Sequence, residues 1–247
     1  ARKTQGCSGA DLENMLNEAT LLAARAGRET ISHTEIEAAR DKILMGLKRH
    51  GLIMTDDEKR MVAYHEAGHS LVGAFLPNAD PVYKVSIIPR SQSMGATQQF
   101  PEQERYIYPR EYLQDRLAVM MGGRCAESLV FNTATSGAAN DLQQATKLAR
   151  KMVLEWGMSG QFEHMALGSA GEQVFLGEEL GKPKEYSEAT SQAVDKEVET
   201  ILQNAFEQAK DILSQHRQAL DRLASTLLDQ EEVPGETVYA IAGISKS

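Results

Sequence analysis

Apolar residues recur at helical spacing in the first part of the chain. Between residues 8 and 26 they fall at every third or fourth position, which predicts an amphipathic helix capped by Ser8. Ser32 and Glu35 then have the spacing of a capping box, which starts a second helix. The periodicity breaks at "GLKRHGLIM", so we place a domain boundary between residues 48 and 49 and expect domains at 1–48 and 49–247.

The rest of the chain also has mostly helical periodicity. "PVYKVSIIPR" is rich in β-branched residues and alternates in part, which predicts a strand, with "GATQQF" as its partner in a hairpin. "MGGR" either interrupts a helix or lets another helix pack closely, and residues 168–186, rich in Gly and charge, favour a mobile loop. The expected fold is therefore mainly α with a small β-hairpin, its further helices covering residues 55–76, 109–130, 141–156 and 187–228.

Composition and charge narrow the classes of function. The 247 residues carry a net charge of −9, which does not favour nucleic acid as a partner because phosphate contacts need clustered Lys and Arg. Cys7 and Cys125 are far apart and form no CxxC pair, so we expect both to be reduced. No apolar run approaches the roughly 20 residues of a membrane span. The chain begins without Met, and we expect it to be part of a longer protein.

The candidate chemistry lies in "YHEAGH", residues 64–69. Positions i and i+4 share one helix face, so His65 and His69 can offer two imidazole nitrogens to one metal ion. Glu66 points to a neighbouring direction, where a carboxylate serves as general base for a zinc-activated water. The small residues Ala67 and Gly68 leave room above the helix, which we assign to a peptide backbone. The alternative is a pair of solvated histidines, but the apolar residues around them predict a buried helix.

A hydrolytic zinc site needs a third protein ligand. The extended motif HExxHxxGxxH is excluded because Val72 and Phe75 stand where it needs Gly and His. Glu127 in "GGRCAES" and Asp141 in "SGAANDL" are the two carboxylate candidates, and the loop of small residues before Asp141 favours it. The remaining histidines have sequence contexts typical of a surface or a domain junction: His33, His50, His164 and His216.

A series of segments in fixed order gives the chain a specific resemblance over nearly its whole length. It resembles the FtsH-type membrane-anchored AAA+ zinc proteases. "SGADLENMLNEATLLAAR" is similar to the end of the AAA+ lid and "DKILMGLKR" to the junction with the protease. The protease segments follow in order: "AYHEAGHSLVG", "KVSIIPR", "GATQQFP", "MGGRCAESLVF", "TSGAANDLQQATKLARKMV", "WGMS" and "YSEATSQAVDKEV".

The resemblance implies a site and a fold. It implies one Zn²⁺ per chain on His65, His69 and Asp141, with Glu66 as the catalytic glutamate. Glu127 would then hydrogen-bond near the metal instead of binding it. The fold implied is a helical zinc-metalloprotease domain preceded by the terminal helices of an AAA+ lid, and the strand at 82–88 would offer its edge to an extended substrate.

The resemblance also implies a function and a setting. The chain would be the zinc endopeptidase of an ATP-dependent protease that forms a homo-hexamer and degrades misfolded, regulatory or membrane proteins. A phosphate loop is absent from the sequence, so ATP would be used by an upstream module. Preceding segments would anchor it in the bacterial inner membrane, facing the cytoplasm, or else in a mitochondrial or chloroplast membrane. A catalytically silent oligomerisation or chaperone scaffold is the alternative function.

Overall fold

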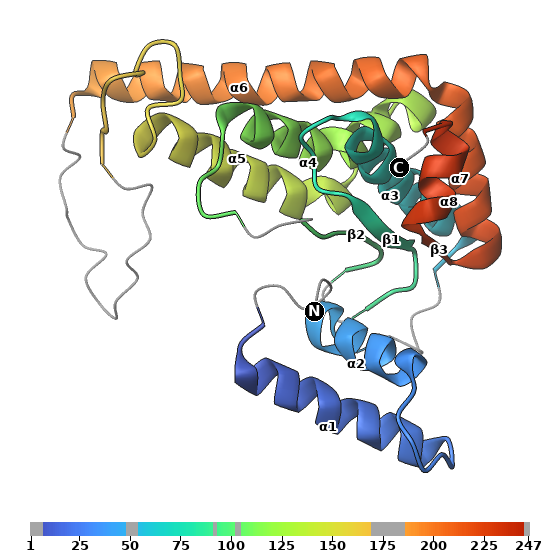
Figure 1. Ribbon diagram of the computed structural model, residues 1–247. Helices are drawn as coiled ribbons and strands as arrows, with labels where there is room; N and C mark the ends of the chain where they lie inside the picture. The colour runs from blue at the N-terminus through green and yellow to red at the C-terminus, as the bar shows by residue number, and fades with distance from the viewer. Residues whose placement is uncertain (1–6, 48–53, 91–92, 102–104, 169–185, 245–247) are drawn as a thin grey trace.

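The chain folds into eight α-helices and a small sheet within the part that the computed structural model describes, which is residues 7–47, 54–90, 93–101, 105–168 and 186–244. This confirms the expected, mainly helical fold (Figure 1). The elements in chain order are α1 (Gly9–Arg25), α2 (His33–Met45), α3 (Asp56–Phe75), β1 (Val82–Ser86), β2 (Ala96–Gln99), α4 (Arg110–Phe131), a 3₁₀ turn η1 (Ser136–Ala138), α5 (Ala139–Leu154), α6 (Glu188–Gln215), α7 (Arg217–Gln230), β3 (Glu232–Pro234) and α8 (Gly235–Ala242).

Helices α1 and α2 pack against each other and form a small core of their own. Both predicted N-termini are confirmed, since Ser8 caps α1 and Ser32 with Glu35 forms a capping box on α2. Figure 1 places this pair below the sheet, with α2 nearer to it. The predicted boundary between residues 48 and 49 lies outside the described residues.

Helix α3 is the central element of the larger body. Thr55 and Glu58 cap its start, and eleven consecutive residues from Ala63 to Gly73 are buried. It packs mainly against α4 and α7, while α6 runs across α4 and α5 (Figure 1). The helical stretch predicted from 187 to 228 is divided at His216 into α6 and α7. A helix that is buried on nearly every side holds its side chains in fixed positions.

The sheet has three antiparallel strands in the order β2-β1-β3. The predicted hairpin is confirmed, with Val85 opposite Thr97. The expectation that the strand at 82–88 offers a free edge is wrong, because β3 pairs with the other side of β1. The strand β3 was not predicted, because its three residues are too few to show an alternating pattern. The edges of the sheet are thus β2 and β3, and β2 lies beside α3.

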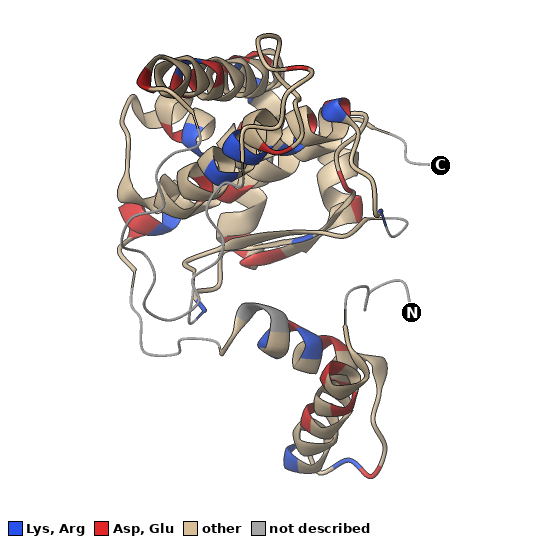
Figure 2. Cartoon of the chain, turned by 90° about the vertical axis from the view of Figure 1, so that its left-hand side faces the viewer, with Lys and Arg blue, Asp and Glu red and all other residues tan. Residues whose placement is uncertain are grey.

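Acidic and basic residues are interspersed along the helices (Figure 2). Within the described ranges, no helix combines the length and apolar character that a membrane crossing requires. The loop predicted at 168–186 lies outside the described residues except at its two ends. Both cysteines are free, as expected: Cys125 is buried and Cys7 is half-buried.

Candidate metal centre

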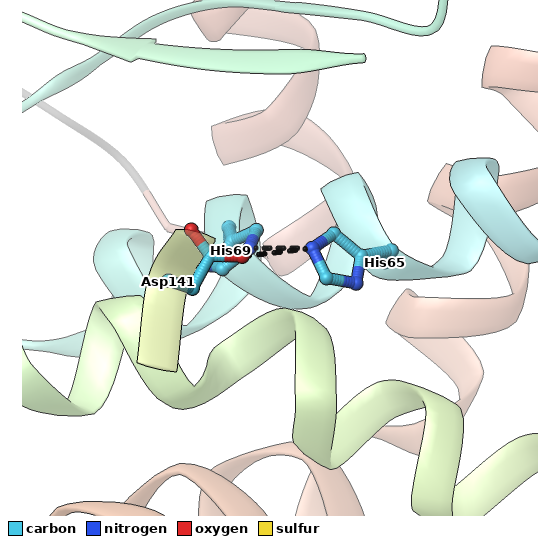
Figure 3. Close-up of side chains that lie close together, drawn as sticks. All are labelled: His65, His69 and Asp141. Atoms are coloured by element: carbon cyan, nitrogen blue, oxygen red, sulfur yellow. Dashed lines mark hydrogen bonds and ion pairs between the residues drawn. The ribbon is translucent and has the colours of Figure 1, made fainter. Parts of the chain in front are cut away.

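His65 and His69 lie one turn apart on α3, and both are buried. Their Nε2 atoms are 3.0 Å apart. Asp141, in the first turn of α5, brings its Oδ2 to 3.2 Å from His65 Nε2 and 3.4 Å from His69 Nε2. Figure 3 shows the three side chains turned toward one another. The three residues that we expected to bind a metal are therefore brought together.

The outer nitrogens of both rings have hydrogen-bond acceptors. His65 Nδ1 donates to Glu127 Oε1 at 2.8 Å, and His69 Nδ1 donates to the Val119 carbonyl at 2.7 Å. These bonds place a hydrogen on each Nδ1 and aim each Nε2 at the other ring and at Asp141. Histidines that bind metals are held in this way by a partner on the far side of the ring.

The three inner atoms fit a tetrahedral zinc ion. Zinc lies about 2.0–2.1 Å from nitrogen and oxygen ligands, which puts two ligands of a tetrahedron about 3.3 Å apart. The observed separations of 3.0, 3.2 and 3.4 Å bracket that value. A triangle of three such ligands leaves the fourth position of the tetrahedron for water or substrate.

The charges of the cluster also favour a bound cation. Burial lowers the pKa of His65, but the hydrogen bonds with Asp141 and Glu127 outweigh burial and raise it to about 10. Burial likewise raises the pKa of Asp141, and its contacts with the two histidines more than reverse this and lower it. These contacts therefore favour a positive charge at the three atoms, which either a proton or a metal ion can supply.

Glu127 lies on the other side of the His65 ring, away from Asp141. It is 1% exposed, and both its oxygens accept hydrogen bonds from Thr135, at 3.0 and 3.1 Å. Burial raises the pKa of Glu127, and the hydrogen bonds from His65 and Thr135 outweigh it and lower the pKa. Sequence spacing alone left two carboxylates as candidates for the third ligand. Asp141 lies at the Nε2 atoms of both histidines, and Glu127 lies at His65 Nδ1.

The other histidines lie away from this cluster where the structure describes them. His33 contacts Glu37 on the exposed side of α2, and His216 stacks on Phe75 with ring centroids 3.8 Å apart. His164 is exposed, and His50 lies outside the described residues.

Two glycines of "MGGR" explain how α4 approaches the site. The helix is continuous through them, so the motif permits close packing and does not interrupt it. A Cβ on Gly122 would lie 2.8 Å from the Gly68 carbonyl oxygen, and a Cβ on Gly123 would lie 2.5 Å from His65 Nε2. The space above Gly68 is thus filled by the backbone of α4. Our assignment of this space to the backbone of a substrate peptide is therefore wrong.

Glu66 points away from these helices toward β2. Its Oε2 accepts a hydrogen bond of 2.8 Å from the Thr97 hydroxyl, and the side chain is buried beside Gly95. Burial raises the pKa of Glu66 above its usual value. Thr97 lies in the predicted strand "GATQQF", and its contact with Glu66 becomes visible only when that strand is placed beside α3.

An HExxH helix at the centre of a helical domain, with a carboxylate from a second helix at its histidines, defines a metallopeptidase of the HExxH class. The comparisons with known proteins agree. Residues 52–241 match Peptidase family M41, and residues 1–38 match the AAA+ lid domain. The chain belongs to Peptidase family M41.

Several curated relatives align with nearly the whole chain. All of those given below are named ATP-dependent zinc metalloprotease FtsH. ATP-dependent zinc metalloprotease FtsH 2 of Salinibacter ruber (strain M8) is 58% identical over 96% of this chain and 35% of its own length. ATP-dependent zinc metalloprotease FtsH of Acidimicrobium ferrooxidans is 49% identical over 96% of the chain and 36% of its own length. The protein of that name from Pelobacter propionicus is 47% identical, over 98% and 39%. The chain thus spans about a third of the length of these relatives.

Proposed function

We propose that this chain is the zinc-dependent endopeptidase part of an ATP-dependent protease. The metal ligands are His65, His69 and Asp141, and Glu66 is the catalytic residue. The observation that carries the proposal is the convergence of three ligand atoms, 3.0 to 3.4 Å apart, with both outer nitrogens already bonded. The relatives described above are named ATP-dependent zinc metalloproteases, which supports zinc as the metal.

The chain's own residues would act on the peptide bond as follows. Zinc in such a site supplies Lewis-acid activation of water and of the peptide carbonyl. Glu66 takes a proton from the attacking water and delivers it to the leaving amide nitrogen. Burial of Glu66 suits this role, because it raises the pKa of the carboxyl toward neutral pH. A group with such a pKa can both accept a proton and give it back.

The test is metal analysis and proteolysis with one charge removed. Zinc is measured in the purified full-length protein, and cleavage of unfolded casein is compared between wild type, Glu66→Gln and the control Glu199→Gln. Glu199 is an exposed residue of α6, so the control removes an equal charge far from the site. We expect about one zinc per chain in all three proteins and a loss of cleavage of at least about 100-fold in Glu66→Gln alone.

Two outcomes would contradict this assignment. Equal cleavage by wild type and Glu66→Gln shows that Glu66 is not the base. A protein that assembles but does not cleave, with or without Glu66, is the oligomeric scaffold of the alternative hypothesis.

The setting of the activity belongs to the same proposal. The match to the AAA+ lid and the relatives' names support an ATPase module upstream of residue 1 and a boundary between 1–48 and 49–247. We propose a homo-hexamer that takes unfolded or membrane proteins as substrates and is anchored in a bacterial inner membrane, with this domain in the cytoplasm. The relatives named above come from bacteria. Native mass measurement tests the hexamer, and membrane fractionation tests the anchor.

A further inference from the structure

We propose that Thr97 is a positioning residue for the reaction. Its hydroxyl holds Glu66 Oε2, so that Oε1 is the oxygen that exchanges a proton with water and substrate. The inference rests on the proposed function, since it concerns the same carboxylate.

The contact joins two elements that are far apart in the sequence. Thr97 Oγ1 is 2.8 Å from Glu66 Oε2 and 3.2 Å from the Glu66 backbone carbonyl oxygen. Within the described residues, no hydrogen bond to Oε1 is found. A glutamate has three side-chain torsions, and a single fixed oxygen removes most of that freedom.

The Thr97 hydroxyl lies near two acceptors of Glu66, the carboxylate and the backbone carbonyl. A hydroxyl carries one hydrogen and can donate to one acceptor at a time. The Glu66 carbonyl also lies 2.9 Å from the hydroxyl of Ser70, which is fully buried on α3 and lies 3.1 Å from the Ala67 carbonyl as well. Thr97 donates to the carboxylate, because Oε2 is the nearer acceptor, at 2.8 Å against 3.2 Å, and a charged acceptor makes the stronger bond.

The backbone around Thr97 packs against the Glu66 carboxylate and fixes the strand. A Cβ on Gly95 would lie 2.7 Å from Oε1, so only a glycine lets the backbone approach that oxygen so closely. Thr97 pairs with Val85 of the central strand β1, and Val85 is fully buried. The hydroxyl is thus presented from a rigid strand, which is what a positioning group needs.

The experiment compares Thr97→Val, Thr97→Ser and Thr97→Ala in the full-length protein with ATP. Valine has the shape of threonine without its hydroxyl, and serine keeps the hydroxyl. Thr200→Val is the matched control, because Thr200 is exposed on α6 and its hydroxyl donates to the Lys196 carbonyl of the same helix. The readouts are kcat and KM on a short fluorogenic peptide, zinc content, and the Glu66 side chain in crystal structures of wild type and Thr97→Val.

We expect Thr97→Val to lower kcat by about 10- to 100-fold with KM within about twofold, because misplacing a catalytic group affects the chemical step. Thr97→Ser should stay within about threefold of wild type, zinc content should remain at one per chain, and Glu66 should leave its position in the valine variant. If Thr97→Val does not fold, Thr97→Ala removes the same hydroxyl without added bulk and should give the same loss.

Wild-type kcat in Thr97→Val or Thr97→Ala overturns the inference, and so does an equal loss in Thr97→Ser. An unmoved Glu66 carboxylate in the valine variant overturns it as well. Glu66→Gln, assayed alongside, separates this failure from failure of the proposed function. An inactive Glu66→Gln beside a fully active Thr97→Val leaves the peptidase in place and removes the role of Thr97.

Discussion

At the scale of single residues, variants of Glu127 and Asp141 test the contacts at the two nitrogens of the His65 ring. Glu127 lies at Nδ1 and Asp141 at Nε2. Glu127→Gln weakens the acceptor at His65 Nδ1, and loss of such a partner typically raises a metal dissociation constant about 10- to 100-fold. Asp141→Asn removes a charged ligand atom from the cluster and should abolish tight binding. Competition with a chromophoric chelator measures both constants.

The two variants also serve as controls for each other. Saturating zinc should restore cleavage in Glu127→Gln and not in Asp141→Asn. The opposite pattern would make Glu127 the third ligand.

Cys125 is a second residue with a defined expectation. Burial raises the pKa of its thiol to about 12, and it is fully buried in α4. Only the thiolate reacts with alkylating reagents, and its fraction increases only as pH rises toward that pKa. At pH 8 iodoacetamide should therefore modify Cys7 and leave Cys125 unmodified in the folded protein, as read by mass spectrometry. Modification of Cys125 at the rate of Cys7 would contradict the burial on which this rests.

At the scale of elements, the close crossing of α3 and α4 depends on Gly122 and Gly123. Gly122→Ala places a Cβ against the backbone of α3, and such overpacking costs about 1–3 kcal/mol. Gly123→Ala places its Cβ against the ring atoms of both histidines, so we expect it to lose zinc as well. Gly160→Ala is the control, since nothing lies within 4 Å of its added Cβ. Thermal unfolding and zinc content distinguish the three, and a wild-type zinc content in Gly123→Ala would be evidence against the expected clash.

Many features of the helices could be predicted from the sequence, because they depend on interactions between residues close together in the chain. Capping boxes, helical periodicity and the HExxH spacing depend on neighbours within a few residues, so Thr55, Glu58 and the face shared by His65 and His69 follow from local rules. The short strand β3 and the bond from Thr97 to Glu66 depend on pairing between distant segments. Chemistry alone left Asp141 and Glu127 open, since both end near His65 and differ only in which nitrogen they face.

At the scale of the whole molecule, Asp41 links α2 to the sheet. It is 5% exposed and forms ion pairs with Lys84 of β1, Arg90 and Arg40. Asp41→Asn leaves these cations without their shared anion, and removing one partner of a buried pair costs about 3–5 kcal/mol. Calorimetry should show α1 and α2 separating from the larger body at lower temperature.

The control for this contact is Asp195→Asn. Its pair with Arg150 is exposed on both sides, and such pairs contribute about 0–1 kcal/mol. Equal unfolding temperatures for the two aspartate variants would show that the Asp41 contact does not hold the two parts together.

Metal removal tests the molecule as a unit. A ligand at about 1,000 times its dissociation constant stabilises the folded state by about 4 kcal/mol, which is roughly 10 °C in Tm for a domain of this size. A chelator should lower the Tm of wild type by that amount and leave the Tm of Asp141→Asn unchanged. A Tm of wild type that does not respond to the chelator would contradict a structural contribution of the metal.

The separation of the site residues along the chain has one last consequence. His65 and Asp141 are 76 positions apart, and the groups that bond Glu66, the proposed catalytic residue, and the two histidines come from β2 and α4. A nascent chain that ends after α3 contains the whole HExxH motif but lacks β2, α4 and Asp141 of α5. We therefore expect no peptide hydrolysis until β2, α4 and α5 have brought these groups to α3.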